Sequence, residues 1–342
     1  AKGTTLGADN GIGVALALSV LQDKTLRHGP LEALITYDEE TGMTGANSLK
    51  AGILKGDILL NLDSEEEGEL CTGCAGGVDG AADFAYRTYK TPEGFVGYKI
   101  TVKGLKGGHS GMDISLFRGN ANKIICRLLE AVISEYDVKV ASITGGSLRN
   151  AIPFEAEAEI LVPSADSRKV KALVEKKFEE SKFEYQYSDP DMILIYEKQS
   201  APAARYISPK VIGKAVKAIL ACPHGVQRMS DTLPGLTETS TNMAIVRTQK
   251  GHLTVHSLTR SSIDAAKMYL ADSIRYVFEL AGAKYSTSGA YSGWAPKLGT
   301  PMIKVLEDTF KSLFGKELKI TATHGGLECA IMGAKYPNWE MV

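Results

Sequence analysis

Three acidic segments contain residues whose types and spacing could bind a cation or move a proton. Asp9 stands in GADNGIG, Glu39 and Glu40 in DEETG, and Asp63 in NLDSEEEGE. Adjacent carboxylates repel one another, and buried ones are costly unless they are paired or bind a metal. A metal site would make one member of the Glu39–Glu40 pair a ligand and leave the other free as a general base. Charged turns and helix caps are the alternative interpretation of the same residues.

The apolar segments between these acids predict the elements that position them. They favour a helix at 11–23, a strand at 31–37, a short helix at 43–51 and a strand at 57–62. A strand, a helix and a second strand with short connections form a βαβ unit, so we expect a parallel sheet buried on both faces. Glu39, Glu40 and Asp63 then follow the carboxyl ends of strands, at the edge where open α/β sheets bind ligands.

The pattern changes near residue 76 to Gly- and Ala-rich sequence followed by alternating strands. Predicted strands at 98–104 and 155–163 and predicted helices at 120–136 and 166–181 follow in the order of a ferredoxin-like layer. A similar set recurs at 208–290. We therefore predict α/β architecture: a mostly parallel catalytic domain at 1–75 and 296–342, and an inserted α+β lid domain of doubled ferredoxin-like units at 76–295.

Composition narrows the classes of function. The 342 residues are 44% hydrophobic and 23% charged, and the net charge of −1 gives no electrostatic reason for binding nucleic acid or an anionic membrane. No apolar stretch approaches the roughly 18 residues that span a bilayer. The five cysteines do not form a disulfide framework, and Cys71 and Cys74 have no second pair at zinc-ribbon spacing. We expect a cytoplasmic protein.

Two other motifs fail on inspection. GADNGIG lacks the order of GxGxxG and has only six residues before it, too few for the strand that a phosphate loop requires. GGHSG has Met112 where the serine-hydrolase pattern GxSxG needs glycine. Neither nucleotide binding nor serine hydrolysis is supported.

The chain resembles the aminoacyl-histidine dipeptidases (Xaa-His dipeptidases, peptidase D) in TTLGADNGIG, DEETGMTGA, LLNLDSEEEGE, GLKGGHSG, GGSLRNAIP and THGGLEC, in this order and at these separations. These enzymes belong to the dinuclear zinc peptidases, with carnosinases, tripeptide aminopeptidases and succinyl-diaminopimelate desuccinylase. The resemblance covers essentially the whole chain. It implies a homodimeric metallopeptidase that hydrolyses Xaa-His and related dipeptides with two Zn²⁺ per subunit. Mn²⁺ or Co²⁺ would also suit such ligands.

The resemblance also implies roles for the acidic residues. Asp9 matches the aspartate that bridges both metals, and the peptide bond to Asn10 is commonly cis in this group. Glu39 matches the general base that activates water. Glu40 matches a ligand of one metal, and Asp63 a ligand of the other.

Further residues match positions that contact the substrate. His109 matches a lid histidine that stabilises the tetrahedral oxyanion in the partner subunit's site, and a donor placed there is worth about 3–4 kcal/mol. Asn150 and Arg260 match residues that hold the C-terminal carboxylate of the substrate, for which a guanidinium is the natural partner. Gly325 and Glu328 match a loop that lines the pocket.

The sequence departs from the family pattern in one respect. The family supplies two histidine metal ligands, and none of the six histidines fits either position. We expect both ligands to lie outside residues 1–342, in a longer protein. The alternatives are another member of the group, such as a tripeptide aminopeptidase or deacylase, and a metal-free, non-catalytic dimeric relative or fragment.

Overall fold

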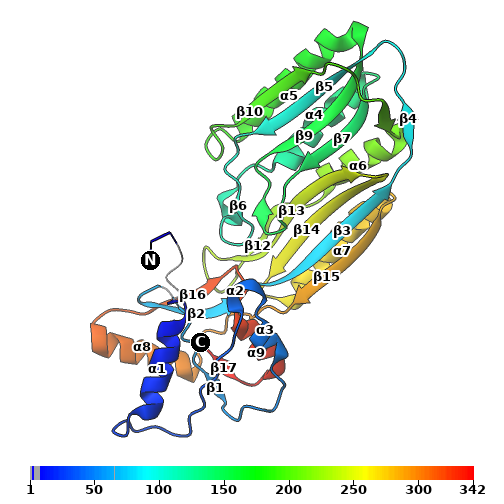
Figure 1. The fold of residues 1–342 in the computed structure, drawn as a ribbon. Coiled ribbons are helices and arrows are strands. Elements are labelled where there is room, and N and C mark those ends of the chain that lie inside the picture. Colours follow the sequence, from blue (N-terminus) through cyan, green and yellow to red (C-terminus); the bar gives the residue numbers. More distant parts are fainter. Residues whose placement is uncertain (1, 4–7, 65) are drawn as a thin grey trace.

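The computed structural model describes residues 2–3, 8–64 and 66–342. Figure 1 shows two parts of unequal size. The large part is an elongated sheet with its helices, and the small part carries the elements from the beginning and the end of the chain. The first motif therefore lies partly outside the described residues, at 4–7.

The large part contains a nine-stranded antiparallel sheet within the described residues. Its order is β10-β5-β9-β7-β13-β14-β3-β15, and β12 pairs with β13. The strands are β3 (Gly76–Ala85), β5 (Phe95–Lys103), β7 (Lys139–Gly145), β9 (Ala156–Pro163), β10 (Ile193–Lys198), β12 (Gly225–Met229), β13 (Thr237–Gln249), β14 (His252–Ser261) and β15 (Lys284–Tyr291). Short pairs also form between β4 (Thr88–Lys90) and β11 (Arg205–Ile207), and between β6 (Gly108–His109) and β8 (Ala151–Ile152).

The sheet is built from two similar units. The first combines β5, β7, β9 and β10 with the helices α4 (Ala121–Glu135) and α5 (Ser167–Glu184). The second combines β3, β13, β14 and β15 with α6 (Pro209–Ala221) and α7 (Asp264–Leu280). The units join where β7 pairs with β13 at Gly145–Val246 and Thr144–Arg247. The predicted doubling is confirmed, but β3 precedes the whole first unit, so that one unit is inserted into the other.

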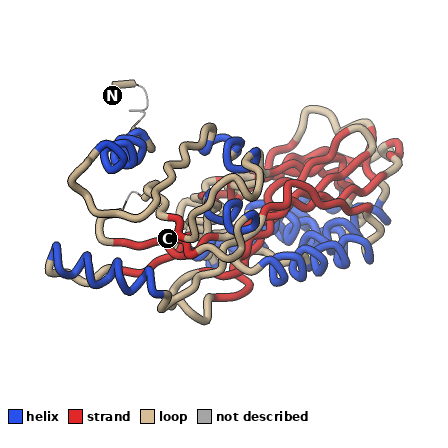
Figure 2. The backbone as a smooth tube through the Cα atoms, turned by 90° about the horizontal axis from the view of Figure 1, so that it is seen from below, coloured by secondary structure: helices blue, strands red, loops and turns tan. Residues whose placement is uncertain are grey.

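The large part is held together by burial of apolar side chains. Helices cover one face of its sheet (Figure 2). α4 turns a continuous apolar stripe toward that face, and its fully buried members are Ile124, Ile125, Leu128, Leu129 and Val132. The extended core of the molecule lies between these helices and the sheet.

The small part differs from the predicted parallel core. It contains two short parallel pairs, β1 (Ile58–Leu59) with β17 (Glu340–Met341), and β2 (Glu69–Cys74) with β16 (Lys319–Thr323). Its helices are α1 (Gly11–Gln22), α2 (Glu39–Gly42), α3 (Thr44–Ser48), α8 (Pro301–Phe314) and α9 (Glu328–Lys335).

The strand predicted at 31–37 is wrong, because the segment forms no ladder with any described strand. The predicted strand at 57–62 shortens to β1. The α/β class holds, but the dominant sheet is antiparallel. No helix in the described ranges has the length and apolarity to cross a bilayer.

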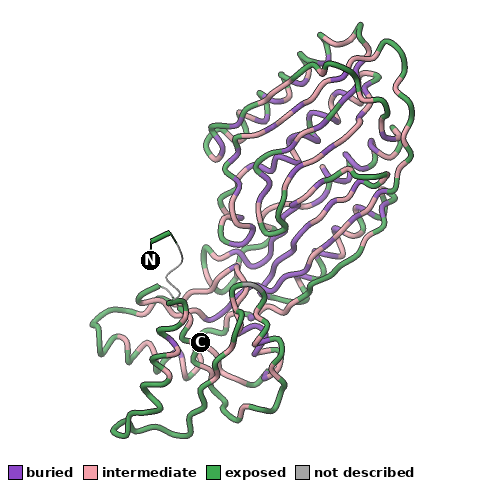
Figure 3. The backbone as a smooth tube through the Cα atoms, viewed as in Figure 1, coloured by how far each residue is buried: buried purple, intermediate pink, exposed green. Residues whose placement is uncertain are grey.

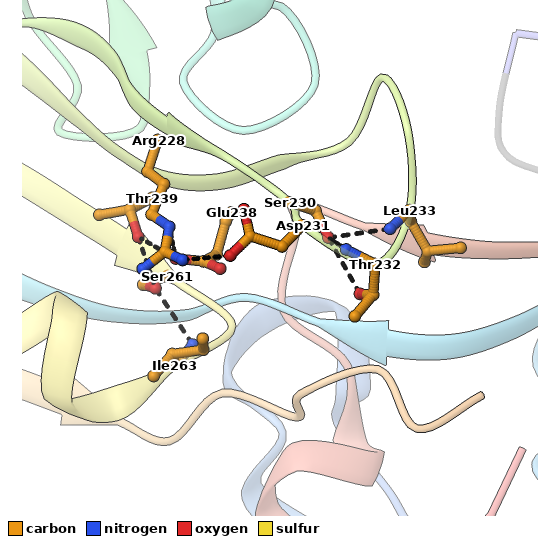
Figure 4. A network of polar contacts seen from close by, with 9 residues as sticks. All are labelled: Arg228, Ser230, Asp231, Thr232, Leu233, Glu238, Thr239, Ser261 and Ile263. Carbon is orange, nitrogen blue, oxygen red and sulfur yellow. Dashed lines mark hydrogen bonds and ion pairs between the residues drawn. The ribbon is translucent and has the colours of Figure 1, made fainter.

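The ends of β13 and β14 nearest the small part are polar and nevertheless buried. Figure 4 shows how they are held. Arg228 of β12 lies 3.4 Å from the carboxylate of Glu238, which is 5% exposed. The hydroxyls of Thr239 and Ser261 are 2.9 Å apart across the two strands, and the amide of Ile263 donates to Ser261 Oγ. Because these groups satisfy one another, a polar sheet end can be buried beside the small part.

Candidate active site

Five carboxylates from separate segments of the small part form what we call the acidic group. Asp9 precedes α1, and Glu39 and Glu40 begin α2. Asp63 follows β1, and Glu328 is the first residue of α9. The chain thus brings together acids that lie hundreds of residues apart in sequence.

Electrostatics show that these acids are close. Burial raises the pKa of Glu39, and the charges of Glu40, Asp63, Glu328 and Asp9 raise it further, in that order. Burial also raises the pKa of Asp63, with Asp9 as its strongest charged neighbour. Burial is thus the first cause of both shifts, and repulsion among the like charges adds to it.

Two asparagines fix the loops that carry Asp9 and Asp63. Asn10 Oδ1 accepts a hydrogen bond from the amide of Gly13 at 2.8 Å and caps α1. Its Nδ2 donates to the carbonyl of Leu62 at 3.0 Å, which ties the two loops together. Asn61 Oδ1 accepts from the amide of Asp63 at 2.9 Å. The Asp9–Asn10 peptide bond is cis, as predicted.

The acidic group has the donor chemistry of a cation site. Its oxygens are suitable ligands for zinc or manganese, and a bound cation would relieve the repulsion that raises the pKa of Glu39. No histidine is among the groups that shift the pKa of Glu39 or Asp63. Within the described ranges, no three His, Cys, Asp or Glu side chains are already arranged to hold a metal. The acidic group therefore provides suitable ligand atoms for a metal, but its described side chains are not yet arranged as a coordination sphere.

His109 lies in the large part, at the end of β6. Its Nδ1 accepts hydrogen bonds from the amides of Gly111 and Met112, both at 3.2 Å. Burial, and then the charge of Arg260, lower the pKa of His109, so the ring is neutral at pH 7. Since Nδ1 is an acceptor, the proton of the neutral ring resides on Nε2, which is therefore available as a donor.

Arg260 of β14 is 5% exposed and lies next to the His109 loop. Its Nε donates to Ser110 Oγ at 3.4 Å, and its guanidinium donates to the hydroxyl of Tyr291 at 3.1 Å. No carboxylate in the described part of the chain forms an ion pair with it. The exposed Asn150 is adjacent, because its carbonyl accepts from the amide of Ser110 at 2.8 Å. A buried guanidinium without an acid is suited to an anionic ligand.

His324 occupies the contact between the two parts. Its Nε2 lies 2.7 Å from Ser240 Oγ of β13. Burial, and then the charge of Arg260, lower the pKa of His324 to about 3, so the ring is neutral. A Cβ added at Gly111 would come within 2.8 Å of the His324 carbonyl oxygen. The loop that carries His109 therefore packs directly on His324.

The segment after His324 joins the acidic group to the His109–Arg260 region. The amide of Gly325 donates to the hydroxyl of Thr323 at 3.1 Å. A Cβ built on Gly326 would lie 3.2 Å from the Tyr291 ring and 3.5 Å from Met43 Cε. Met43 follows α2, and the Tyr291 hydroxyl holds Arg260. Gly326 thus packs between the residue that follows α2 and the tyrosine that contacts Arg260.

On the small part, the structure groups Asp9, Glu39, Glu40, Asp63 and Glu328, and Gly325 lies in the segment after His324. On the large part, it groups His109, Asn150 and Arg260. Their individual roles remain predictions. Sequence reasoning missed the residues that position them: Asn10, Asn61, Ser110, Tyr291 and His324. His324, Asn10, Asn61 and Ser110 lie within the motifs quoted above, which were their only signal, and Tyr291 has none in the sequence.

Comparison with known proteins gives consistent results. Residues 93–186 match a family model of the M20 peptidases described as the peptidase dimerisation domain. The chain is 42% identical over 342 residues to the cytosol non-specific dipeptidase of Escherichia coli (strain K12), covering all of this chain and 70% of the relative. It also matches the crystal structure of an aminoacylhistidine dipeptidase from Vibrio alginolyticus, with a TM-score of 0.94 and 44% identity, over 99% of this chain and 69% of that one.

Proposed function

Because the chain belongs to the M20 peptidase family that contains these metal-dependent dipeptidases, we propose that it hydrolyses Xaa-His and related dipeptides. One observation supports this activity most directly. The small part carries the acidic group, and the large part carries Arg260, a buried guanidinium with no carboxylate partner among the described residues. A dipeptide carries one positive and one negative end, so a site with opposite charges on its two sides complements it.

The acidic group would hold the metal. Asp9, Glu40 and Asp63 would hold two Zn²⁺ ions, with Mn²⁺ or Co²⁺ as substitutes. Such ions lower the pKa of water and polarise a peptide carbonyl. The hydrogen bonds of Asn10 and Asn61 hold the loops of Asp9 and Asp63 in place for metal binding.

Glu39 is assigned to proton transfer. Burial raises its pKa, which brings the carboxylate closer to the operating pH of a general base. It takes the proton of the attacking water and delivers it to the leaving amine. Nε2–H of His109 donates to the oxygen on which negative charge develops, and Arg260 and Asn150 bind the C-terminal carboxylate.

We also propose that the protein is a homodimer in the cytoplasm. The matched peptidase dimerisation domain supports the assembly, since it covers β5, α4, β7, β9 and α5. The name of the Escherichia coli relative supports the compartment. Size-exclusion chromatography with light scattering tests the assembly, and a monomer mass would contradict it.

Glu39→Gln in the full-length, metal-loaded protein tests the assignment of the base. The amide keeps the size of the side chain but cannot accept a proton, so we expect kcat for Ala-His to fall by about 10²–10⁴-fold. The matched control is Glu67→Gln, an exposed acid in the loop after Asp63, which should leave kcat unchanged.

Metal content by plasma mass spectrometry is measured on the same samples. Near two zinc ions per chain in both variants supports the enzyme. Unchanged turnover in Glu39→Gln would refute the role of Glu39, and a metal-free, inactive parent protein would favour the non-catalytic alternative.

A further inference from the structure

Glu328 is the acid that the mechanism above does not use. Its Oε2 accepts a hydrogen bond from Thr36 Oγ1 at 2.9 Å, which fixes the orientation of the carboxylate. Its Oε1 is buried and has no hydrogen-bond partner among the described residues. A buried carboxylate oxygen without a donor is costly, so this orientation favours a ligand that brings the donor.

The surroundings of Glu328 indicate the charge of that ligand. Glu328 lies close enough to Glu39 and Asp63 to raise the pKa of both. No lysine or arginine in the described part of the chain forms an ion pair with it. It is also the first residue of α9, where the helix dipole favours the ionised carboxylate. Because the Glu328 carboxylate has no cationic partner among the described residues, it is suited to bind a positively charged group of a ligand.

The geometry of a dipeptide specifies which group this is. Glu328 is among the charges that raise the pKa of Glu39, so the two carboxylates are neighbours in the acidic group. The scissile carbonyl must lie beside Glu39, and the α-ammonium is attached to the carbon next to that carbonyl. The ammonium therefore falls among the acids, where Glu328 Oε1 is the buried oxygen that lacks a donor.

We propose that Glu328 binds the free α-ammonium of the substrate and makes the enzyme select dipeptides with an unblocked N-terminus. This inference rests on the proposed dipeptidase function and goes beyond it, because it identifies the residue that distinguishes a dipeptidase from a deacylase. Thr36 acts as a positioning residue through its bond to Oε2.

Calorimetric binding in the Glu39→Gln background separates recognition from turnover, because the ligand is not consumed. The full-length, zinc-loaded protein is titrated with Ala-His and with N-acetyl-Ala-His. Adding Glu328→Gln should weaken Ala-His binding by about 10- to 100-fold, the usual range for a hydrogen bond to a charged group. The affinity for N-acetyl-Ala-His should change by less than about twofold, because this ligand has no ammonium.

Three comparisons sharpen the test. Thr36→Val should weaken Ala-His binding in the same direction but less, and Glu67→Gln should not change it. The preference for Ala-His should also decline above about pH 8, where the α-amine loses its proton. Circular dichroism and zinc content of each variant show whether the fold and the metals are retained.

Two outcomes would overturn the inference. Equal losses of affinity for Ala-His and N-acetyl-Ala-His would show that Glu328 does not bind the ammonium. Loss of zinc in Glu328→Gln would make it a metal ligand instead. Failure of the proposed function is a separate result, since it would appear as an absence of hydrolysis by the parent protein while the binding comparison still reports on Glu328.

Discussion

Two helices rich in apolar residues, α4 in the large part and α1 in the small part, differ sharply in burial. Leu129 of α4 is fully buried, whereas Leu16 of α1 is 53% exposed and Ile12 is 65% exposed. Figure 3 shows the same contrast along the backbone, with buried strands in the large part and mostly exposed segments in the small part. Helical periodicity therefore predicts a helix, but the tertiary environment decides how much its apolar face contributes to stability.

The contrast extends to the cores of the two parts. The large part has one extended core beneath its sheet. The small part has two small clusters, one around Cys74, Trp294 and Cys329 and one around Ile331 and Met332. We infer that the large part holds most of the stability measured on this chain, while the small part holds most of the acids proposed for chemistry. Functional residues often lie on the less stable elements of a fold.

The largest expected effect comes from truncating a leucine on each helix. Leu129→Ala should lower the free energy of unfolding by about 2–5 kcal/mol, because it leaves a cavity in the core. Leu16→Ala should change it by less than about 0.5 kcal/mol, because the side chain is half exposed. Urea unfolding followed by circular dichroism measures both. Equal effects would show that α1 is as well packed as α4.

A smaller loss of stability is expected when the pH is lowered. Burial lowers the pKa of His224 in the large part and of His324 in the small part to about 3. Each histidine takes up a proton near pH 6.5 in the unfolded protein but not in the folded one. Its contribution to the free energy of unfolding is therefore complete above pH 6.5 and is lost as the pH falls toward 3. Between pH 7 and pH 5 we expect about 2 kcal/mol to be lost per histidine.

Urea midpoints at the two pH values measure this loss. His324→Gln should reduce it by about half, because His224 remains. An unchanged pH dependence in this variant would show that His324 is not held neutral at the contact between the two parts.

The smallest effect is expected where the two parts meet. Arg228→Ala removes the cation beside the buried Glu238 carboxylate, and because Arg228 is half exposed we expect a loss of about 1 kcal/mol. Thermal unfolding of the variant and of Arg168→Ala, an exposed arginine of α5, provides the comparison. A larger loss in Arg168→Ala would contradict the importance of this network.

Much of the fold could be predicted from the sequence, particularly in the large part. The helices expected at 120–136 and 166–181 correspond to α4 and α5. The strand expected at 31–37 is wrong although its apolar residues favour a strand. A strand also needs a neighbour to accept its backbone hydrogen bonds, and a local pattern contains no information about that neighbour.

The candidate site divides in the same way. Asp9, Glu39, Glu40 and Asp63 could be singled out by their type and spacing, and His109 and Arg260 by the motifs around them. Asn10, Asn61 and Tyr291 could not, because each acts through a contact with a residue distant in the chain or with a backbone group. Such contacts are defined only once the chain has folded.

By itself, the sequence determined the helical and strand periods, the order of the motifs and the acidic character of the candidate site, because each depends on residues near one another in the chain. The tertiary structure alone decided that β3 belongs to a unit completed only by β15 at Lys284–Tyr291, that α1 remains largely exposed, and that Gly326 packs between Met43 and Tyr291. The physical reason is that pairing and burial depend on distances in space, and the chain connects distant segments in many ways that satisfy the same local pattern.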